Sequence, residues 1–257
     1  MKIIPWLHNR TLPYLGLVAA CLAGSLSAHG QVIIQHNGST DPATEGFTLS
    51  GNELESNSLT IGAVTTPEAA WEISNDGTDA LSRAFYQYNF TTANFNLANA
   101  AGGLLLSTRI MVPVANQSIT DSGSLVDFQT ANAFSPGQAR YSIRFGSNAD
   151  GHLLVRLGSQ TTIDVGAGGF HDVDLFVSAD DGLSQLIING TMVLENIAGS
   201  SANIPGSLRF GGIAAGHAGS TYFGEVTITA VPEPATVALI MGGLVLVWVC
   251  VRRKLGA

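Results

Sequence analysis

The sequence predicts an all-β domain, an antiparallel sandwich of two sheets, and three observations support this fold class. Short segments alternate polar and apolar residues with a period of two, as in residues 140–145 and 172–177. Asn, Asp and Gly separate such segments at positions suited to tight turns. No segment between the two ends of the chain has the pattern of an amphipathic helix of three turns. Because the strands are many and no repeat period is present, we expect a jelly-roll sandwich rather than a propeller or a solenoid.

The expected strands follow one another along the chain. The segments that we interpret as strands are residues 31–35, 71–74, 83–90, 104–112, 140–145, 153–157, 172–177, 185–188, 192–194, 207–212 and 222–229. Tight turns are expected at residues 148–151, 180–182 and 189–190, where Asn, Asp or Gly can adopt a positive φ or bond its own backbone. The segment 185–194, with Asn189-Gly190 at its centre, predicts a β-hairpin.

Residues 1–28 have the composition of a secretory signal peptide. Two basic residues, Lys2 and Arg10, precede an apolar stretch that reaches residue 26, and small residues follow it. We therefore expect an exported protein whose mature chain begins near residue 28. The alternative is a lipoprotein signal with an acylated Cys21, which is less favoured because a membrane anchor at the other end of the chain would make it redundant.

Residues 231–257 combine three features in a fixed order. The Pro-rich turn Val231-Pro232-Glu233-Pro234 precedes the uncharged segment 235–251, and the basic triplet Arg252-Arg253-Lys254 opens the tail 252–257. Seventeen helical residues extend about 25 Å, and the hydrocarbon core of a bilayer is about 30 Å thick. We therefore expect a transmembrane helix over 235–251. Positive charges beside a span remain in the cytoplasm, which places the preceding residues outside it.

This C-terminal arrangement resembles the PEP-CTERM sorting signal of Gram-negative bacteria. The resemblance rests on Pro232-Glu233-Pro234, the hydrophobic segment and the basic triplet, and it covers the last 27 residues. It implies a protein that is exported, held transiently in the inner membrane and processed by an exosortase near the motif. It also implies a final place at the cell surface or in the extracellular matrix, in association with extracellular polysaccharide. The alternative is an ordinary single-span anchor with a Pro-rich turn beside the membrane.

Residues 29–230 make up the expected exported domain, which is long enough for one complete core. All of the 19 acidic residues except Glu233 lie in it, against six arginines and no lysine, so its net charge is −12 while the whole chain has −8. This balance argues against binding to nucleic acid or to an anionic membrane surface. Cys21 and Cys250 both lie outside the domain, which excludes a disulfide, a thiolate nucleophile and a cysteine metal site within it.

The domain itself is similar to LamG-like, concanavalin A-like domains. The segments 171–177 and 186–193, with the turn at 180–182, resemble the late hairpin of that family. Segments 207–212 and 221–228 match its closing strand pair, and segments 71–74 and 83–90 match its early strands. The resemblance implies a jelly roll over about residues 69–229, and it bears on the fold rather than on any one function.

Five aromatic residues are candidates for stacking on sugar rings, because an aromatic face is apolar and has polar groups nearby. They are Trp71, Tyr86, Tyr88, Tyr141 and Tyr222. Core packing is the alternative for each of them, and it is favoured for Trp71.

Asp76, Asp79 and Asp150 are candidate oxygen ligands for calcium. A calcium site needs six to eight oxygens, normally from several segments. Neither Asp-rich segment, 75–79 or 148–151, completes an EF-hand loop, so turn formation is the favoured role. Calcium remains an alternative because of the strong negative charge.

Asp172 and Asp174 are the carboxylate pair that a glycosidase would require, and on a strand they share one face. Laminarinase-like hydrolases carry Glu-x-Asp-x-x-Glu, whereas the segment 172–177 ends in Val and lacks the last carboxylate. A solvated strand face is therefore favoured. The sequence predicts a non-catalytic, exported, glycan-binding or structural protein, with a polysaccharide-active enzyme, a glycanase or lyase, and a purely structural biofilm component as alternatives.

Overall fold

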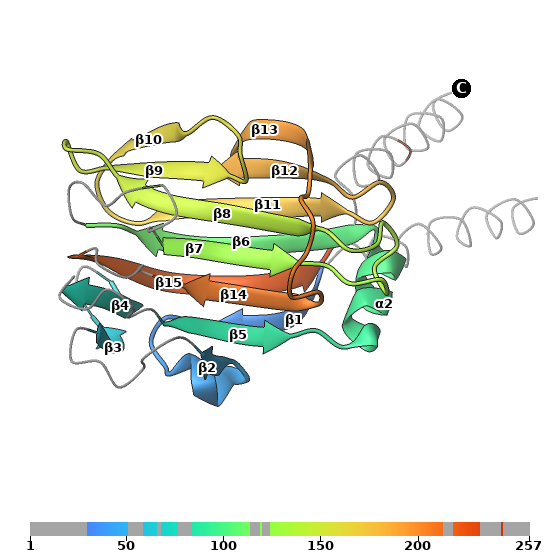
Figure 1. The fold of residues 1–257 in the computed structure, drawn as a ribbon, viewed down its shortest axis with the longest axis horizontal. Helices are drawn as coiled ribbons and strands as arrows, with labels where there is room; N and C mark the ends of the chain where they lie inside the picture. The colour runs from blue at the N-terminus through green and yellow to red at the C-terminus, as the bar shows by residue number, and fades with distance from the viewer. Residues whose placement is uncertain are drawn as a thin grey trace, which may run out of the picture.

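Two antiparallel β-sheets lie face to face in the computed structural model of the protein. The structure describes residues 30–50, 59–65, 68–76, 84–113, 119, 124–212, 218–231 and 243. Figure 1 looks onto the outer face of one sheet, with the other sheet behind it. The predicted antiparallel two-sheet sandwich is confirmed, since every strand pair in the described part of the chain is antiparallel.

The rear sheet in Figure 1, sheet A, is built around its longest strand, β15. Across sheet A the order is β13 (Thr191–Ala198), β12 (Leu183–Ile188), β11 (His171–Ser178), β6 (Gly103–Met111), β15 (Ala218–Ala230), β4 (Ala70–Asp76) and β3 (Leu59–Val64), and β1 (Gln31–His36) also pairs with β15. Across the nearer sheet, sheet B, the order is β10 (Ile163–Ala167), β9 (His152–Leu157), β8 (Arg140–Ser147), β7 (Ser124–Gln129), β14 (Ser207–Gly211), β5 (Phe85–Asn89) and β2 (Thr48–Ser50).

The inward side chains of the two sheets form one apolar core, because alternate residues of a strand point to opposite faces. Phe210 of β14 lies at the centre of an aromatic cluster within this core. Its ring centroid is 5.2 Å from that of Phe47, 5.4 Å from that of Tyr86 and 5.1 Å from that of Phe223. Phe210 belongs to sheet B and Phe223 to sheet A, so the contact between their rings joins the two sheets and helps to fix how they pack.

The three predicted turns are confirmed. Asn189 and Gly190, with φ of 50° and 75°, form the turn of the β12–β13 hairpin, and both need the left-handed region that Asn and Gly tolerate. Gly182, with φ of 71°, lies in the β11–β12 turn, and Gly151, with φ of 78°, lies in the β8–β9 turn.

The α-helix α2 (Thr92–Ala101) and the short 3-10 helix η1 (Pro42–Glu45) are not predicted by the sequence pattern. In α2 only Phe95 and Ala98 are buried, so its apolar periodicity is weak. Local signals set its ends instead. Thr91 and Asn94 form a reciprocal capping box, and Gly102, with φ of 116°, ends the helix in the left-handed conformation.

The described chain begins and ends at the same place in sheet A. Gln31 of β1 pairs with Ala230 of β15, and the Val231 amide donates to the Gly103 carbonyl oxygen at 3.0 Å. The expected signal peptide, Pro232-Glu233-Pro234, the helix over 235–251 apart from residue 243, and Arg252-Arg253-Lys254 lie outside the described residues and stay predictions. Among the residues that are described, no helix has the length and apolar character needed to cross a membrane.

Candidate functional site

Three of the five aromatic residues that we considered as sugar platforms lie in the core. Trp71 is 8% exposed, and Tyr86 and Tyr141 are 2% exposed each. All three occupy inward positions of their strands, and the Tyr141 hydroxyl donates to the Gly182 carbonyl oxygen at 2.5 Å. Burial raises the pKa of both phenols to about 12. These rings offer no face to a ligand outside the domain, which corrects the expectation of sugar stacking for them.

The remaining two aromatic candidates lie on different parts of the molecule. Tyr88 is half-buried against the core, with its ring 5.2 Å from that of Phe90. Tyr222 lies on the outer face of sheet A, where its hydroxyl donates to a carboxylate oxygen of Glu72 at 3.2 Å. The structure therefore does not gather the five aromatic residues into one surface. Sugar stacking stays a prediction for Tyr88 and Tyr222 alone.

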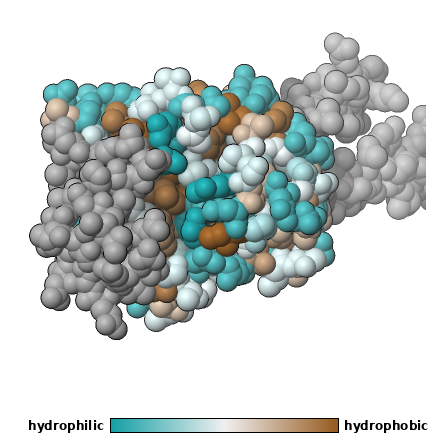
Figure 2. Space-filling view, viewed as in Figure 1, coloured by the Kyte–Doolittle hydropathy of each residue, from teal (hydrophilic) through white to brown (hydrophobic). Residues whose placement is uncertain are grey.

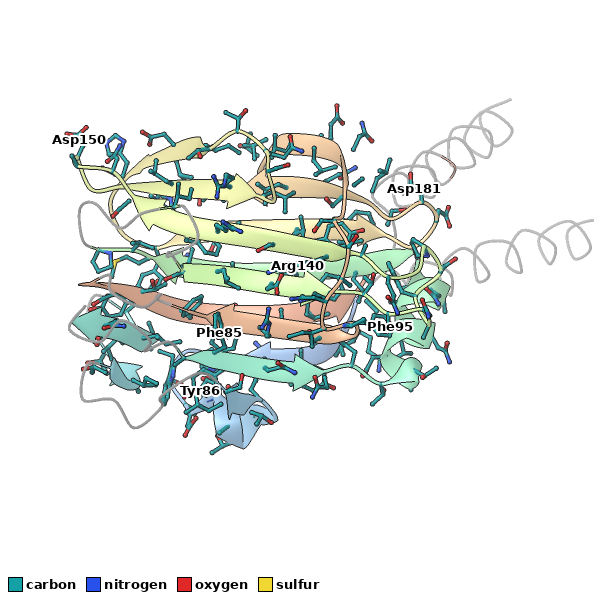
Figure 3. All side chains as sticks on the ribbon, in the orientation of Figure 1. Phe85, Tyr86, Phe95, Arg140, Asp150 and Asp181 are labelled. Carbon is teal, nitrogen blue, oxygen red and sulfur yellow. The ribbon has the colours of Figure 1, made fainter. Side chains whose placement is uncertain are left out.

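Of the three candidate calcium ligands, the structure describes only the side chain of Asp150. Asp150 lies at the exposed tip of the β8–β9 turn, at one end of the sandwich, and Asp181 lies at the other end (Figure 3). The side chain of Asp76 and the whole of Asp79 lie outside the described residues. Within the described ranges, no three His, Cys, Asp or Glu side chains are grouped as a metal site would require. Calcium binding stays a prediction.

Asp172 and Asp174 share the outer face of sheet A, as their spacing predicts. The Arg109 guanidinium donates to Asp172 through Nη1 at 2.8 Å, and to Glu68 through Nε at 2.8 Å and Nη2 at 3.2 Å. Burial raises the pKa of Asp174, and a hydrogen bond from Ser107 partly opposes the shift. Asp172 is thus held in a partly exposed ion-pair network, which favours a solvated strand face over a catalytic pair.

Arginine side chains gather instead on the outer face of sheet B. Six arginines lie in residues 29–230, and five of them are described. Four of these five occupy outward positions of β8, β9 and β14: Arg140, Arg144, Arg156 and Arg209. We call the surface formed by these four arginines with Asp127, Gln129 and Ser142 the arginine face. Figure 2 shows hydrophilic side chains across the middle of this side of the molecule, and Figure 3 labels Arg140 there.

A single buried carboxylate organises two of the arginines. Asp127 of β7 accepts from Arg140 Nε at 2.7 Å, from Arg209 Nη2 at 2.6 Å and from Gln129 Nε2 at 2.9 Å. The Asp127 side chain is 0% exposed, whereas those of Arg140 and Arg209 are 27% and 16% exposed. A guanidinium has five N–H donors in a rigid plane. Asp127 therefore fixes two guanidinium groups in place while leaving them donors for a further acceptor.

The connection from β13 to β14 crosses one end of the arginine face (Figure 1). Gln129 Oε1 accepts from the backbone amides of Asn203 at 2.9 Å and Ile204 at 2.7 Å. The backbones of Arg140 and Ser200 also exchange two hydrogen bonds, at 2.8 and 2.9 Å. These bonds hold the connection on the sheet and give the face a fixed border.

Buried polar atoms without partners are concentrated on the arginine face. Ser142 Oγ, Arg156 Nε and Arg209 Nε are three of the five such side-chain atoms in the described part of the chain. The guanidinium of Arg209 also lies over the Phe85 ring, 5.4 Å from its centroid. An unpartnered buried donor costs about 1–3 kcal/mol, so natural proteins keep few of them. Their concentration here marks a surface that is not optimised for stability alone.

A cavity of about 200 Å³ lies at the end of the sandwich that carries the β8–β9 turn. Its lining is mostly apolar or glycine: Met111, Val112, Pro113, Gly151, Leu153, Gly168, Gly169 and His171. Burial lowers the pKa of His171, and its Nδ1 lies 3.1 Å from the amide nitrogen of Asn189. Because that amide nitrogen donates, Nδ1 of His171 is the acceptor of this hydrogen bond. His171 therefore contacts the β12–β13 turn through Nδ1, and that nitrogen is already engaged within the protein.

Neither the arginines nor Asp127 stand out as a site in the sequence, although one signal points to them. The alternation of residues 140–145 places Arg140 and Arg144 on the outer side of a strand. Arg156 lies on β9, which follows β8 after the turn at residues 148–151 and pairs with it. What the sequence does not reveal is that β14, distant along the chain, adds Arg209 to the same face beside Asp127 of β7.

The PEP-CTERM protein-sorting motif matches residues 230–254. The chain thus carries this motif at its C-terminus, in agreement with the resemblance seen in the sequence. The motif indicates an exported protein that passes the membrane and is sorted to the cell surface, and it implies an exosortase as the processing partner.

Comparison with curated proteins finds no match to this chain. Among solved structures, a carbohydrate esterase from the Shiga toxin-encoding bacteriophage phi24B is similar, with 14% identity and a TM-score of 0.57 over 80% of this chain and 100% of that one. Peanut lectin (10% identity, TM-score 0.47, 79% and 97% covered) and a variant of the alginate lyase Aly36B with an alginate trisaccharide (10%, 0.46, 77% and 97%) are more distant. At these identities the esterase likeness establishes a shared fold alone.

Proposed function

We propose that the protein is an exported, non-catalytic, LamG-like glycan-binding protein of the cell surface or extracellular matrix, with the arginine face as its ligand surface. The observation that carries the proposal is the gathering of four arginines on one sheet of a domain that is otherwise acidic. Beside them lies the neutral hydroxyl of Ser142, and the buried Gln129 holds the connection from β13 to β14 at the border of the face. Polar side chains with fixed positions are what a surface needs to recognise hydroxyl-rich ligands.

The sorting motif supports the location. An exported chain that is released near Pro232-Glu233-Pro234 by an exosortase would leave the whole sandwich outside the cell. The sandwich ends at Ala230 and its last backbone bond is made by Val231, so cleavage after this point removes no described strand. The mass of the protein recovered from the cell surface tests this step: loss of the residues beyond about 233 is expected, and an intact C-terminus contradicts it.

The arrangement of carboxylates supports a non-catalytic role. A glycosidase of the common kinds places two carboxyl groups about the scissile bond. On the outward positions of β7, β8, β9 and β14 the one acidic residue is Asp127, which is buried and ion-paired. Asp172 and Asp174 lie on the other sheet. Release of sugars from a panel of polysaccharides, abolished by Asp172→Asn or Asp174→Asn, would contradict this role and favour the enzyme.

Retention on immobilised polysaccharides tests the binding. The full chain, kept in mild detergent, is passed over neutral and acidic polysaccharides, and we expect it to be retained by at least one. A variant with Gln in place of Arg156 should be retained less. The matched control is Arg109→Gln, which removes the same charge from sheet A and should have no effect. Failure of every polysaccharide to retain the chain would refute the glycan-binding proposal.

A further inference from the structure

We infer that the ligand of the arginine face is an acidic polysaccharide, whose carboxylate or sulfate groups pair with the guanidinium groups. This inference rests on the proposed glycan-binding function and narrows it to one class of ligand. Four observations support it: the positions of the charges, the contacts that hold the arginines, the extent of the arginine face and the buried donors without partners.

The charges of the domain are separated between its two outer faces. Four arginines and one acidic residue, Asp127, occupy the outward positions of β7, β8, β9 and β14, and Asp164 of the edge strand β10 pairs with His152 at the margin of this face. The outer face of sheet A has Asp172, Asp174 and Glu225 around Arg109. Stacked sheets are about 10 Å apart and their outer side chains point away from each other, so solvent-exposed charges on the two faces are separated by more than a Debye length of about 8 Å at physiological salt. An anion at the arginine face therefore meets a local positive field, although the domain as a whole is negative.

The arginines of this face are suited to paired hydrogen bonds with acid groups, and not only to a general electrostatic attraction of anions. The domain contains no lysine, so every fixed positive charge in it is a guanidinium. A guanidinium matches the planar, two-oxygen geometry of a carboxylate or sulfate with paired N–H donors. Asp127 anchors Arg140 by Nε and Arg209 by Nη2, which lowers the entropy lost when these side chains bind. The two groups are positioned before any ligand arrives.

The extent of the arginine face suits a polymer better than a single small anion. Arg209, Asp127 and Ser142 are direct neighbours across β14, β7 and β8, and Arg144 is the direct neighbour of Arg156 on β9. Three strand spacings amount to about 14 Å, and the four residue steps from Arg140 to Arg144 cover about 13 Å along β8. Acid groups repeated along an extended chain can meet several of these arginines together, whereas one small anion meets only one or two.

The buried donors without partners also favour an acidic ligand. Arg156 Nε and Arg209 Nε are buried and bond to nothing in the structure, and Ser142 Oγ lies between the two flanking arginines of its strand without a partner. A bound acid group supplies acceptor oxygens, and a small shift of these side chains toward it would satisfy donors that the free protein leaves unpaired. A neutral sugar offers hydroxyl groups but no charge to draw the guanidinium groups.

The test uses the full chain in mild detergent and three immobilised polymers: polygalacturonate, dextran sulfate and neutral dextran. We expect retention on polygalacturonate, dextran sulfate or both, little on dextran, and weaker retention as salt rises. Arg156→Gln and, separately, Arg144→Gln should weaken binding about tenfold, the loss of one charge-assisted hydrogen bond. Neither residue anchors Asp127, and unchanged thermal melting shows that each variant is folded. Arg109→Gln should bind as the parent does.

Each outcome bears on a different statement. Retention on polygalacturonate but not on dextran sulfate, or the reverse, identifies the acid group and supports the inference. Equal or stronger retention on dextran, insensitive to salt, overturns the acidic class and leaves glycan binding in place. No retention on any polymer refutes the proposed function itself. Concentration-dependent self-association that Arg156→Gln abolishes also overturns the inference, because the arginine face would then be covered by the acidic face of a second copy.

Discussion

Replacing one buried carboxylate by its amide tests how sheet B is held together. Asp127→Asn removes the negative charge that faces both Arg140 and Arg209 at 2.7 and 2.6 Å, while keeping nearly the same shape. One amide oxygen can accept from one guanidinium, and the new amide N–H groups face the other. Breaking a buried ion pair by removing one partner costs about 3–5 kcal/mol. Because both arginines are partly exposed, we expect the lower end, about 3 kcal/mol.

The structure supplies a matched comparison on the other sheet. Asp172→Asn makes the same chemical change in an arginine pair of similar length, 2.8 Å, but the side chains of Arg109 and Asp172 are 39% and 56% exposed. Exposed pairs contribute about 0–1 kcal/mol. Burial is thus the main difference between the two variants.

Urea unfolding of the full chain in mild detergent, at pH 7 and fixed salt, measures both free energies of unfolding. Asp127→Asn should also lower the melting temperature by about 6–12 °C, at about 2–4 °C per kcal/mol for a domain of this size. Equal losses for the two variants, or a loss below about 1 kcal/mol for Asp127→Asn, would show that burial of Asp127 does not determine its contribution.

Three further predictions concern the core and the turns. His36, 0% exposed, bonds Glu45 through Nδ1 at 2.6 Å, and burial lowers its pKa. The stability that the neutral imidazole provides is therefore fully present above the unfolded pKa of about 6.5 and is lost as the pH falls through the lowered folded pKa. His36→Gln should make the urea midpoint depend less on pH between pH 7.5 and 5. Gly38→Ala should cost about 3 kcal/mol or more, since φ is +75° and a Cβ would lie 2.3 Å from a backbone oxygen, whereas Gly151→Ala, at φ +78° in open space, should cost about 1; equal costs in urea unfolding would contradict the contact. Tyr141→Phe leaves the buried Gly182 carbonyl without its donor and should cost about 1–3 kcal/mol in thermal unfolding without changing polysaccharide retention, and weakened retention would place the ring at the ligand after all.

The features that could be predicted from the sequence are those whose causes are local. The β12–β13 hairpin follows from Asn189-Gly190, because few residue pairs accept two positive φ values in succession. Strands with clear alternation, such as β8 and β11, also follow directly. β3 and β10 are harder to see, because Gly62 and Gly166 interrupt their patterns. α2 has too few buried residues to produce a helical pattern, and only its caps mark it.

The candidate site could not be predicted in the same way, since it depends on pairing between distant strands. Alternation shows that Tyr86 and Tyr88 share a face but not that this face is the inner one. Burial is decided by which sheet lies opposite, so aromatic residues that looked available for sugars became core. Asp127 could be recognised as an anchor only after β8 and β14 were found on either side of β7.

The pairing of Gln31 with Ala230 has a consequence for how the molecule is oriented at an envelope. Both ends of the domain leave from one pole of the sandwich, beside α2 (Figure 1) and opposite Asp150 (Figure 3). While the predicted helix over 235–251 holds the domain at a bilayer before cleavage, that pole would lie nearest the lipid, and β1 and β15 would extend away from it along the membrane normal. The outer face of sheet B is then perpendicular to the plane of the membrane and faces sideways. Polymers lying along the cell envelope would pass across the guanidinium groups instead of meeting them end-on.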